Sequence, residues 1–141
     1  MSMKQDVELL LRDLCSRLPY GVKALCTEVS TKKVYEIEGV CVYHKDVPIV
    51  HLRNQGLINM PIMYVKPYLF PLSSMTEEQK KEYNRWKHEV PVCHYEYGDV
   101  VEEVELFDSP ESFEYLIENH FDYRGLIEKG LALDATGLNI Y

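Results

Sequence analysis

The first eighteen residues carry the pattern of an amphipathic helix. Apolar side chains recur at spacings of three and four residues from Val7 to Leu18, and most positions between them are polar or charged. Pro19 and Gly21 follow, and they favour an end to the helix, because proline disfavours helical geometry in the residue before it and glycine permits a turn. The pattern predicts a helix over residues 3–18.

Strand-like patterns follow this helix. Residues 22–29 and 33–43 are rich in β-branched and aromatic side chains, and the short polar segment 30–32 separates them. We expect the two runs to pair as a β-hairpin, with Gly39 marking a bulge in the second strand. A third strand is expected at 48–53, where the leading proline suits a strand's first residue or an edge.

Residues 54–75 are less regular and contain prolines at 61, 67 and 71. Proline removes a backbone donor and is rare inside a sheet. We therefore interpret this stretch as an extended segment lying across the surface, or as a join between two halves of the chain.

Two later helices are indicated by their start signals. Thr76 and Gln79 have the spacing of a capping box, which predicts a helix over 76–88. Ser109 is a favourable N-cap and is followed by a proline and a glutamate, which suit the first helical turn. This second signal predicts a helix over 110–119.

The segment 92–107 fits either a strand or a helix, and we favour a strand at 99–107 that is added to the sheet. The helices are separated from hairpin-linked strands, without strict alternation of strand and helix. The prediction is a single compact α+β domain over residues 1–141. It has a small, mainly antiparallel sheet, an N-terminal helix and two later helices.

Charge is distributed unevenly along the chain. Between Lys87 and Arg124 there is no lysine or arginine, while eleven aspartates and glutamates occur there. The rest of the chain has 15 basic and 12 acidic residues, so the negative excess behind the net charge of −8 comes entirely from this segment.

An acidic surface repels a phosphate backbone and attracts a basic protein, so nucleic-acid binding is disfavoured and a basic partner is expected. Glu102, Glu103 and Glu105 form the centre of the expected binding surface. Arg124 either presents its guanidinium to the partner or forms an ion pair that clamps the last turn to the body. The alternative for the whole segment is a solvated acidic surface that keeps the protein soluble.

Other classes of function have little support. His88, Cys93 and His94 match no ligand spacing for zinc, so we expect no metal, and no motif for a cofactor or a hydrolase is present. Cysteines at 15, 26, 41 and 93 form no CxxC pair and are expected to be reduced. No apolar run is long enough for a membrane span, and residues 1–8 do not resemble a signal peptide, so a cytoplasmic location is expected.

Three blocks of the sequence resemble a known family. They are LCSRLPYGVK at 14–23, VKPYLFPLSSMT at 65–76 and FDYRGLIEKGLAL at 121–133. They are similar to small uncharacterised proteins encoded by gut anaerobes of the Bacteroidetes group and by their phages and mobile elements. The resemblance implies a cytosolic accessory protein and carries over no catalytic residue.

These observations together favour a non-enzymatic interaction protein that uses its acidic residues 89–122 to bind a basic partner. The alternative is a small enzyme in which the fold brings a cysteine and a histidine together. The sequence leaves the oligomeric state open.

Overall fold

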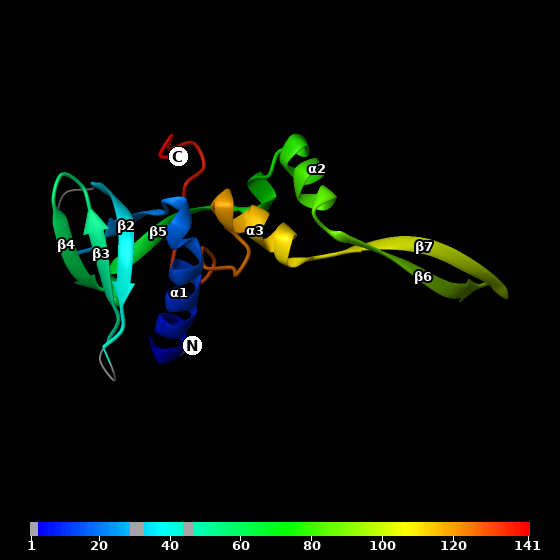
Figure 1. Ribbon diagram of the computed structural model, residues 1–141, viewed down its shortest axis with the longest axis horizontal. Coiled ribbons are helices and arrows are strands. Elements are labelled where there is room, and N and C mark those ends of the chain that lie inside the picture. The colour runs from blue at the N-terminus through cyan, green and yellow to red at the C-terminus, as the bar shows by residue number, and fades with distance from the viewer. Residues whose placement is uncertain (1–2, 29–32, 44–46) are drawn as a thin grey trace.

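The computed structural model describes residues 3–28, 33–43 and 47–141 (Figure 1). The helices are α1 (Met3–Arg17), α2 (Glu77–Arg85) and α3 (Pro110–Glu118), with short 3₁₀ turns at Leu18–Tyr20, Ile62–Tyr64 and Leu72–Ser74. The strands are β1 (Lys23–Cys26), β2 (Val34–Cys41), β3 (Ile49–Arg53), β4 (Leu57–Pro61), β5 (Val65–Pro71), β6 (His88–Glu96), β7 (Asp99–Phe107), β8 (Phe121–Asp122) and β9 (Leu133–Asp134). The predicted α+β class is confirmed.

The main sheet has the strand order β4-β3-β2-β1-β5-β8, with β9 also paired to β5. Strands β1 to β4 are antiparallel to their neighbours, and β5 is antiparallel to β1 but parallel to β8 and β9. The strands expected within 22–53, and the hairpin formed by the first two, are therefore confirmed. The polar segment expected to link them, 30–32, lies outside the described residues.

The expected bulge in β2 is present. The register between β2 and β3 shifts between Ile37 and Gly39, so that Ile37 faces Leu52 and Gly39 faces His51. Ile37 and Leu52 point into the core, whereas Gly39 and His51 lie on the opposite, solvent-facing side of the sheet.

Residues 54–75 are largely extended, as expected, but they form β4 and β5 of the main sheet and do not lie across the surface. Among the described strands, β5 has the most partners. β1 pairs with its first half, and β8 and β9 pair with its second half. Its prolines occur where these pairings end: Pro67 is the last residue paired with β1, and Pro71 ends the strand itself. The proline pattern marks these ends and does not mark a surface segment.

The core has one cluster between α1 and the sheet and a second beneath α2 and α3. In the first cluster, Leu10 and Leu14 of α1 pack against strand residues such as Leu52. The second cluster contains Met75, Leu116 and Phe121, with tyrosines packed around them.

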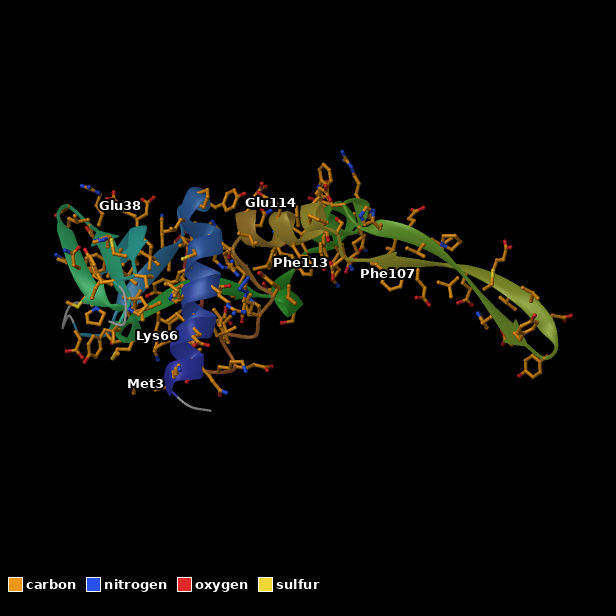
Figure 2. All side chains as sticks on the ribbon, turned by 60° about the horizontal axis from the view of Figure 1, so that its bottom comes forward. Met3, Glu38, Lys66, Phe107, Phe113 and Glu114 are labelled. Carbon is orange, nitrogen blue, oxygen red and sulfur yellow. The ribbon has the colours of Figure 1, made fainter. Side chains whose placement is uncertain are left out.

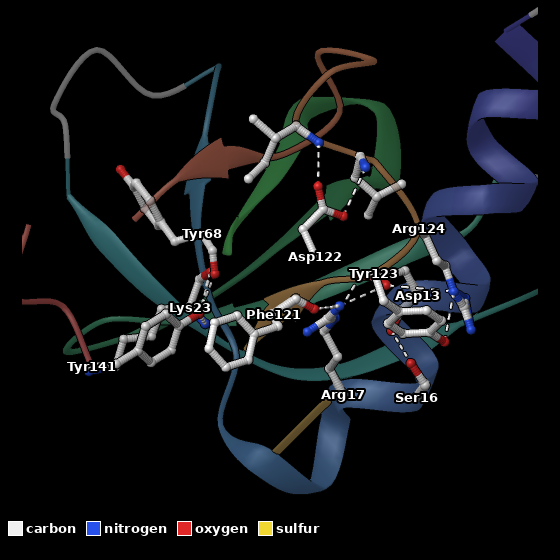
Figure 3. A network of polar contacts seen from close by, with 12 residues as sticks. Asp13, Ser16, Arg17, Lys23, Tyr68, Phe121, Asp122, Tyr123, Arg124 and Tyr141 are labelled. Atoms are coloured by element: carbon white, nitrogen blue, oxygen red, sulfur yellow. Dashed lines mark hydrogen bonds and ion pairs between the residues drawn. The ribbon is translucent and has the colours of Figure 1, made fainter. Parts of the chain in front are cut away.

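A buried ion pair lies within α1, and its arginine also hydrogen-bonds the C-terminal part of the chain (Figure 3). The Arg17 guanidinium donates from Nε to Asp13 Oδ2 at 2.8 Å, and both side chains are completely buried. Arg17 Nη2 also donates to the carbonyl oxygen of Phe121 at 2.7 Å. This network holds the start of β8 against the first helix.

Both predicted helix starts are confirmed. The Thr76 hydroxyl accepts from the Gln79 amide and the Gln79 side chain accepts from the Thr76 amide, which is the expected capping box. Ser109 caps α3 in the same way. Helix α2 is shorter than the predicted 76–88, since it ends at Arg85 and β6 begins three residues later.

The expected addition of 99–107 to the main sheet is wrong. These residues form β7, which pairs with β6 in a separate two-stranded sheet. The resulting hairpin, residues 88–107, projects away from the body beyond α2 and α3 (Figure 1). The chain leaves the body after α2 and returns to it at α3.

Candidate functional site

The projecting hairpin is held in shape by its turn and its backbone pairing. Its nine cross-strand pairs run without interruption from His88 with Phe107 to Glu96 with Asp99. Tyr97 and Gly98 connect the strands with φ angles of 53° and 87°, which is the left-handed geometry of a two-residue hairpin turn. Gly98 adopts such an angle readily because it has no Cβ.

The hairpin side chains are almost all exposed, as Figure 2 shows for both sides of the ribbon. Only Val92 and Val101 are half-buried. Tyr95, Val100 and Val104 are 80%, 60% and 65% exposed. A two-stranded hairpin alone is marginally stable in water, so this much uncovered strand is unusual for a segment without a partner.

The cross-strand register divides the hairpin into two faces, because directly paired residues point to the same side. One face, called here the acidic face, carries Glu96, Asp99, Glu103 and Glu105, together with Val90, Val92, Val101, Phe107, His88 and His94. The other, called the apolar face, carries Pro91, Cys93, Tyr95, Val100, Val104 and Leu106, together with Glu89 and Glu102.

The base of the hairpin is fixed to α2 and α3. The Ser109 hydroxyl donates to the carbonyl oxygen of Trp86 at 2.5 Å, which ties the two ends of the hairpin together. The Tyr83 hydroxyl donates to Asp108, and burial together with this hydrogen bond raises the pKa of Tyr83. The Tyr83 ring also stacks on Tyr115 of α3.

An open groove lies beside this base. Its volume is about 290 Å³, and it is lined by Trp86, Pro110, Glu111, Glu114, Tyr115 and Glu118. The three glutamates share one side of α3, because they are three and four residues apart. Glu114 accepts a hydrogen bond from the Tyr20 hydroxyl, and this bond raises the pKa of Tyr20 to about 12. An aromatic wall beside carboxylates suits the side chain of an arginine or lysine.

The structure separates the residues expected to form the binding surface. Glu103 and Glu105 lie on the acidic face of the hairpin, whereas Glu102 lies on the apolar face opposite Cys93. Arg124 lies on the body, where its Nε is 3.8 Å from Asp13 and donates to the Tyr123 hydroxyl at 2.9 Å (Figure 3). Its guanidinium thus contributes to the buried network of α1, apart from the three glutamates.

Sequence reasoning did not identify the apolar face or the groove. The alternation in 88–107 contains the apolar face, but the strand pairing is needed to place Tyr95 beside Val100 and Pro91 beside Val104. The groove is lined by residues outside this segment, which only the fold brings together. The Tyr97-Gly98 pair was the available signal, because a glycine between two alternating segments is typical of a hairpin turn.

The described residues 3–28, 33–43 and 47–141 contain neither a metal-binding cluster nor a membrane-spanning helix. In this part of the chain, no group of three or more histidine, cysteine, aspartate or glutamate side chains is arranged to hold a metal ion. His94 instead lies 3.8 Å from Glu96. None of the helices described has the length and apolar character needed to cross a membrane.

A second polar cluster lies on the main sheet, away from the hairpin. The Sγ atom of Cys41 is 3.0 Å from Nε2 of His51. Cys26 is buried, and Cys15 and Cys93 are exposed.

Comparison of the chain with protein-family models, with curated proteins and with solved structures gives no match.

Proposed function

We propose that this chain is a non-enzymatic, cytoplasmic accessory protein that binds a basic protein partner through the hairpin and the groove at its base. The observation that carries the proposal is the exposure of residues 88–107, which include six carboxylates and no lysine or arginine. The resemblance to proteins of Bacteroidetes and their mobile elements supports an accessory role.

Charge favours a basic partner over a second copy of this chain. Two identical hairpins packed together would bring twelve carboxylates near one another, and like charges at an interface oppose association. A basic surface would instead be attracted over a distance of about 8–10 Å at physiological ionic strength.

The two faces and the groove would contribute differently to binding. The acidic face would speed encounter with the partner, because complementary charge acts mainly on the association rate. Tyr95, Val104 and Leu106 on the apolar face would supply the buried contacts that hold the complex together. The groove would accept one arginine or lysine side chain of the partner between Trp86 and the glutamates of α3.

The test is capture of the partner by the tagged protein from lysate of its own host, with elution by a salt gradient and identification by mass spectrometry. The variant E102K/E103K/E105K reverses three hairpin charges. The matched control E8K/E28K/E128K makes the same change of net charge at exposed glutamates on the body.

We expect a basic protein that is retained by the original chain and by the control, is released at moderate salt, and is lost by the hairpin variant. Equal retention by all three proteins, or equal loss from both variants, would contradict a role for the hairpin surface. A captured protein that is acidic, or that resists salt, would contradict the proposed charge complementarity.

A further inference from the structure

Three side chains on neighbouring strands form a hydrogen-bonded row on the solvent-facing side of the main sheet. β2, β3 and β4 are neighbours in the main sheet (Figure 1). Cys41 ends β2, His51 lies in the middle of β3, and Asn59 lies in the middle of β4. Cys41 Sγ is 3.0 Å from His51 Nε2, and His51 Nδ1 is 2.5 Å from Asn59 Oδ1. Cys41 and His51 are half-buried and Asn59 is exposed, so the row is open to small molecules.

The strand register builds this row. His51 is paired with Asn59 on one side and with Gly39 on the other. A Cβ atom at Gly39 would lie 3.4 Å from Cδ2 of the His51 ring, so the glycine leaves the ring room above β2. From there the imidazole reaches Cys41, which lies two residues further along the strand.

The hydrogen bonds define the protonation of the histidine. The side-chain oxygen Oδ1 of Asn59 accepts a hydrogen bond from Nδ1–H of His51. Nε2 of the neutral imidazole is therefore free to accept the thiol proton. The hydrogen bond with His51 lowers the pKa of the Cys41 thiol, and the bonds to Cys41 and Asn59 raise the pKa of His51. Both shifts favour the thiolate–imidazolium form of the pair.

Two other polar groups near the pair also favour the thiolate–imidazolium form. The Tyr43 hydroxyl, from the segment that follows β2, also hydrogen-bonds Cys41 and lowers the pKa of its thiol. The Glu38 carboxylate raises the pKa of His51, and Glu38 itself is held in an ion pair with Arg53.

We propose that Cys41 is a nucleophilic thiol that forms a mixed disulfide with low-molecular-weight disulfides, with His51 holding the proton and Asn59 fixing the orientation of the imidazole. The inference is independent of the proposed binding function, since Cys41 lies on the main sheet and not on the hairpin.

The reaction balances without a further reagent. The thiol proton of Cys41 moves to His51 Nε2, and the thiolate attacks one sulfur of the disulfide RS–SR. A bond forms between Cys41 Sγ and that sulfur while the S–S bond breaks. The leaving RS⁻ takes the proton from His51 Nε2, so the products are the mixed disulfide of Cys41 and one RSH.

A disulfide fits this site because exchange at sulfur requires a thiolate and access, and the leaving thiolate takes up a proton. The pair of Cys41 and His51 supplies the thiolate and the proton, and its position on the open side of the sheet supplies access. No negative charge develops on an oxygen atom, so the step needs no additional donors for an oxyanion.

The test follows the reaction of the folded protein with 2,2′-dithiodipyridine as a function of pH. One protein, C15S/C93S, keeps Cys41 as its accessible thiol beside the buried Cys26. The matched reference, C15S/C41S, keeps the exposed Cys93 instead. The released thiopyridone gives the rate, and peptide mapping identifies the modified cysteine.

An ordinary thiol with a pKa near 8.5 has about fiftyfold less thiolate at about pH 6.5 than at about pH 8.5. We expect the rate at Cys41 to fall by less than about tenfold over this pH range, and by less than the rate at Cys93 in the reference protein. The substitutions H51Q and N59A, made in the C15S/C93S protein, should return Cys41 towards the steeper dependence.

A fall at Cys41 of about fiftyfold, or one as steep as that measured at Cys93, would overturn the proposal, as would an unchanged pH profile in H51Q. The ultraviolet absorbance of the thiolate, titrated in C15S/C93S, measures the same property without any substitution at His51 or Asn59. A thiolate that appears only at the pH of an ordinary cysteine would likewise refute the proposal.

Discussion

The hairpin should be dispensable for folding, and this can be tested by removing it. Residues 89–106 are replaced by Asn-Gly, which leaves His88 joined to Phe107 by a two-residue turn. These two residues are cross-strand partners, so their Cα atoms are about 4.5–5.5 Å apart and a turn of this length closes the gap.

The structure gives a small expected change in the free energy of unfolding. Neither hydrophobic cluster contains a residue of 88–107. The half-buried Val92 and Val101 lie on the same face of the hairpin and are removed together with it. The bond between Ser109 and Trp86 and the stacking of Tyr83 on Tyr115 are kept. We therefore expect a change within about 1 kcal/mol.

Urea unfolding, followed by the fluorescence of Trp86 and by circular dichroism, measures this change. The single tryptophan lies at the base of the hairpin and so reports on the region nearest the deletion. The denaturant dependence should also change little, because it scales with the surface exposed on unfolding and the hairpin is exposed already. A loss of more than about 2 kcal/mol would refute the reasoning, since it would give the hairpin a structural role in holding α2 and α3.

Three further substitutions test other parts of the structure by urea unfolding. Asp13→Asn should destabilise the protein by about 3–5 kcal/mol, because the buried Arg17 guanidinium loses its counter-charge; a loss below about 1 kcal/mol would contradict that burial. Ser109→Ala should cost about 0.5–2 kcal/mol, because one hydroxyl caps α3 and also closes the base of the hairpin, and no change would show that neither bond matters. Burial lowers the pKa of His120 from 6.5 to about 4. Below about pH 6.5 the unfolded chain therefore takes up a proton at this histidine, whereas the folded protein does not. The free energy of unfolding should therefore fall as the pH drops from 6.5 towards 4. Asparagine tolerates the positive φ of 62° at this position, so His120→Asn is the matched substitution. The pH dependence of stability should be weaker in this variant between about pH 7 and 4.5. An equal pH dependence in both proteins would exclude His120 as its source.

Local signals in the sequence predicted the elements whose structure depends on neighbouring residues. The periodicity of α1 and the capping boxes of α2 and α3 follow from contacts within a few residues, and the β1–β2 hairpin pairs two runs that follow each other directly in the sequence. The mistakes concern elements that are defined by distant partners. β5 contains Pro67 and Pro71 and still occupies an inner position, because its pairing passes from one neighbour to others along its length.

The hairpin shows a related limit. Apolar and polar residues alternate along both of its strands. The same alternation would arise whether the strands pair with each other or with the main sheet. Pro91 favours an edge position, which every strand of a two-stranded sheet has. The sequence alone shows the excess of acidic residues in this segment. How these residues divide between the two faces of the hairpin depends on the strand pairing.

The row formed by Cys41, His51 and Asn59 depends on a single irregularity. Tyr35 and Ile37 are buried, and strict alternation along β2 would place Cys41 on the same side, among the core residues. The shift at Gly39 changes this parity, since one extra residue in β2 reverses the side to which every later side chain points. Val40 therefore faces Val50 and packs against the core cluster, and Cys41 emerges beside His51. The glycine could be read from the sequence as a bulge, but its effect on the thiol required the register of both strands.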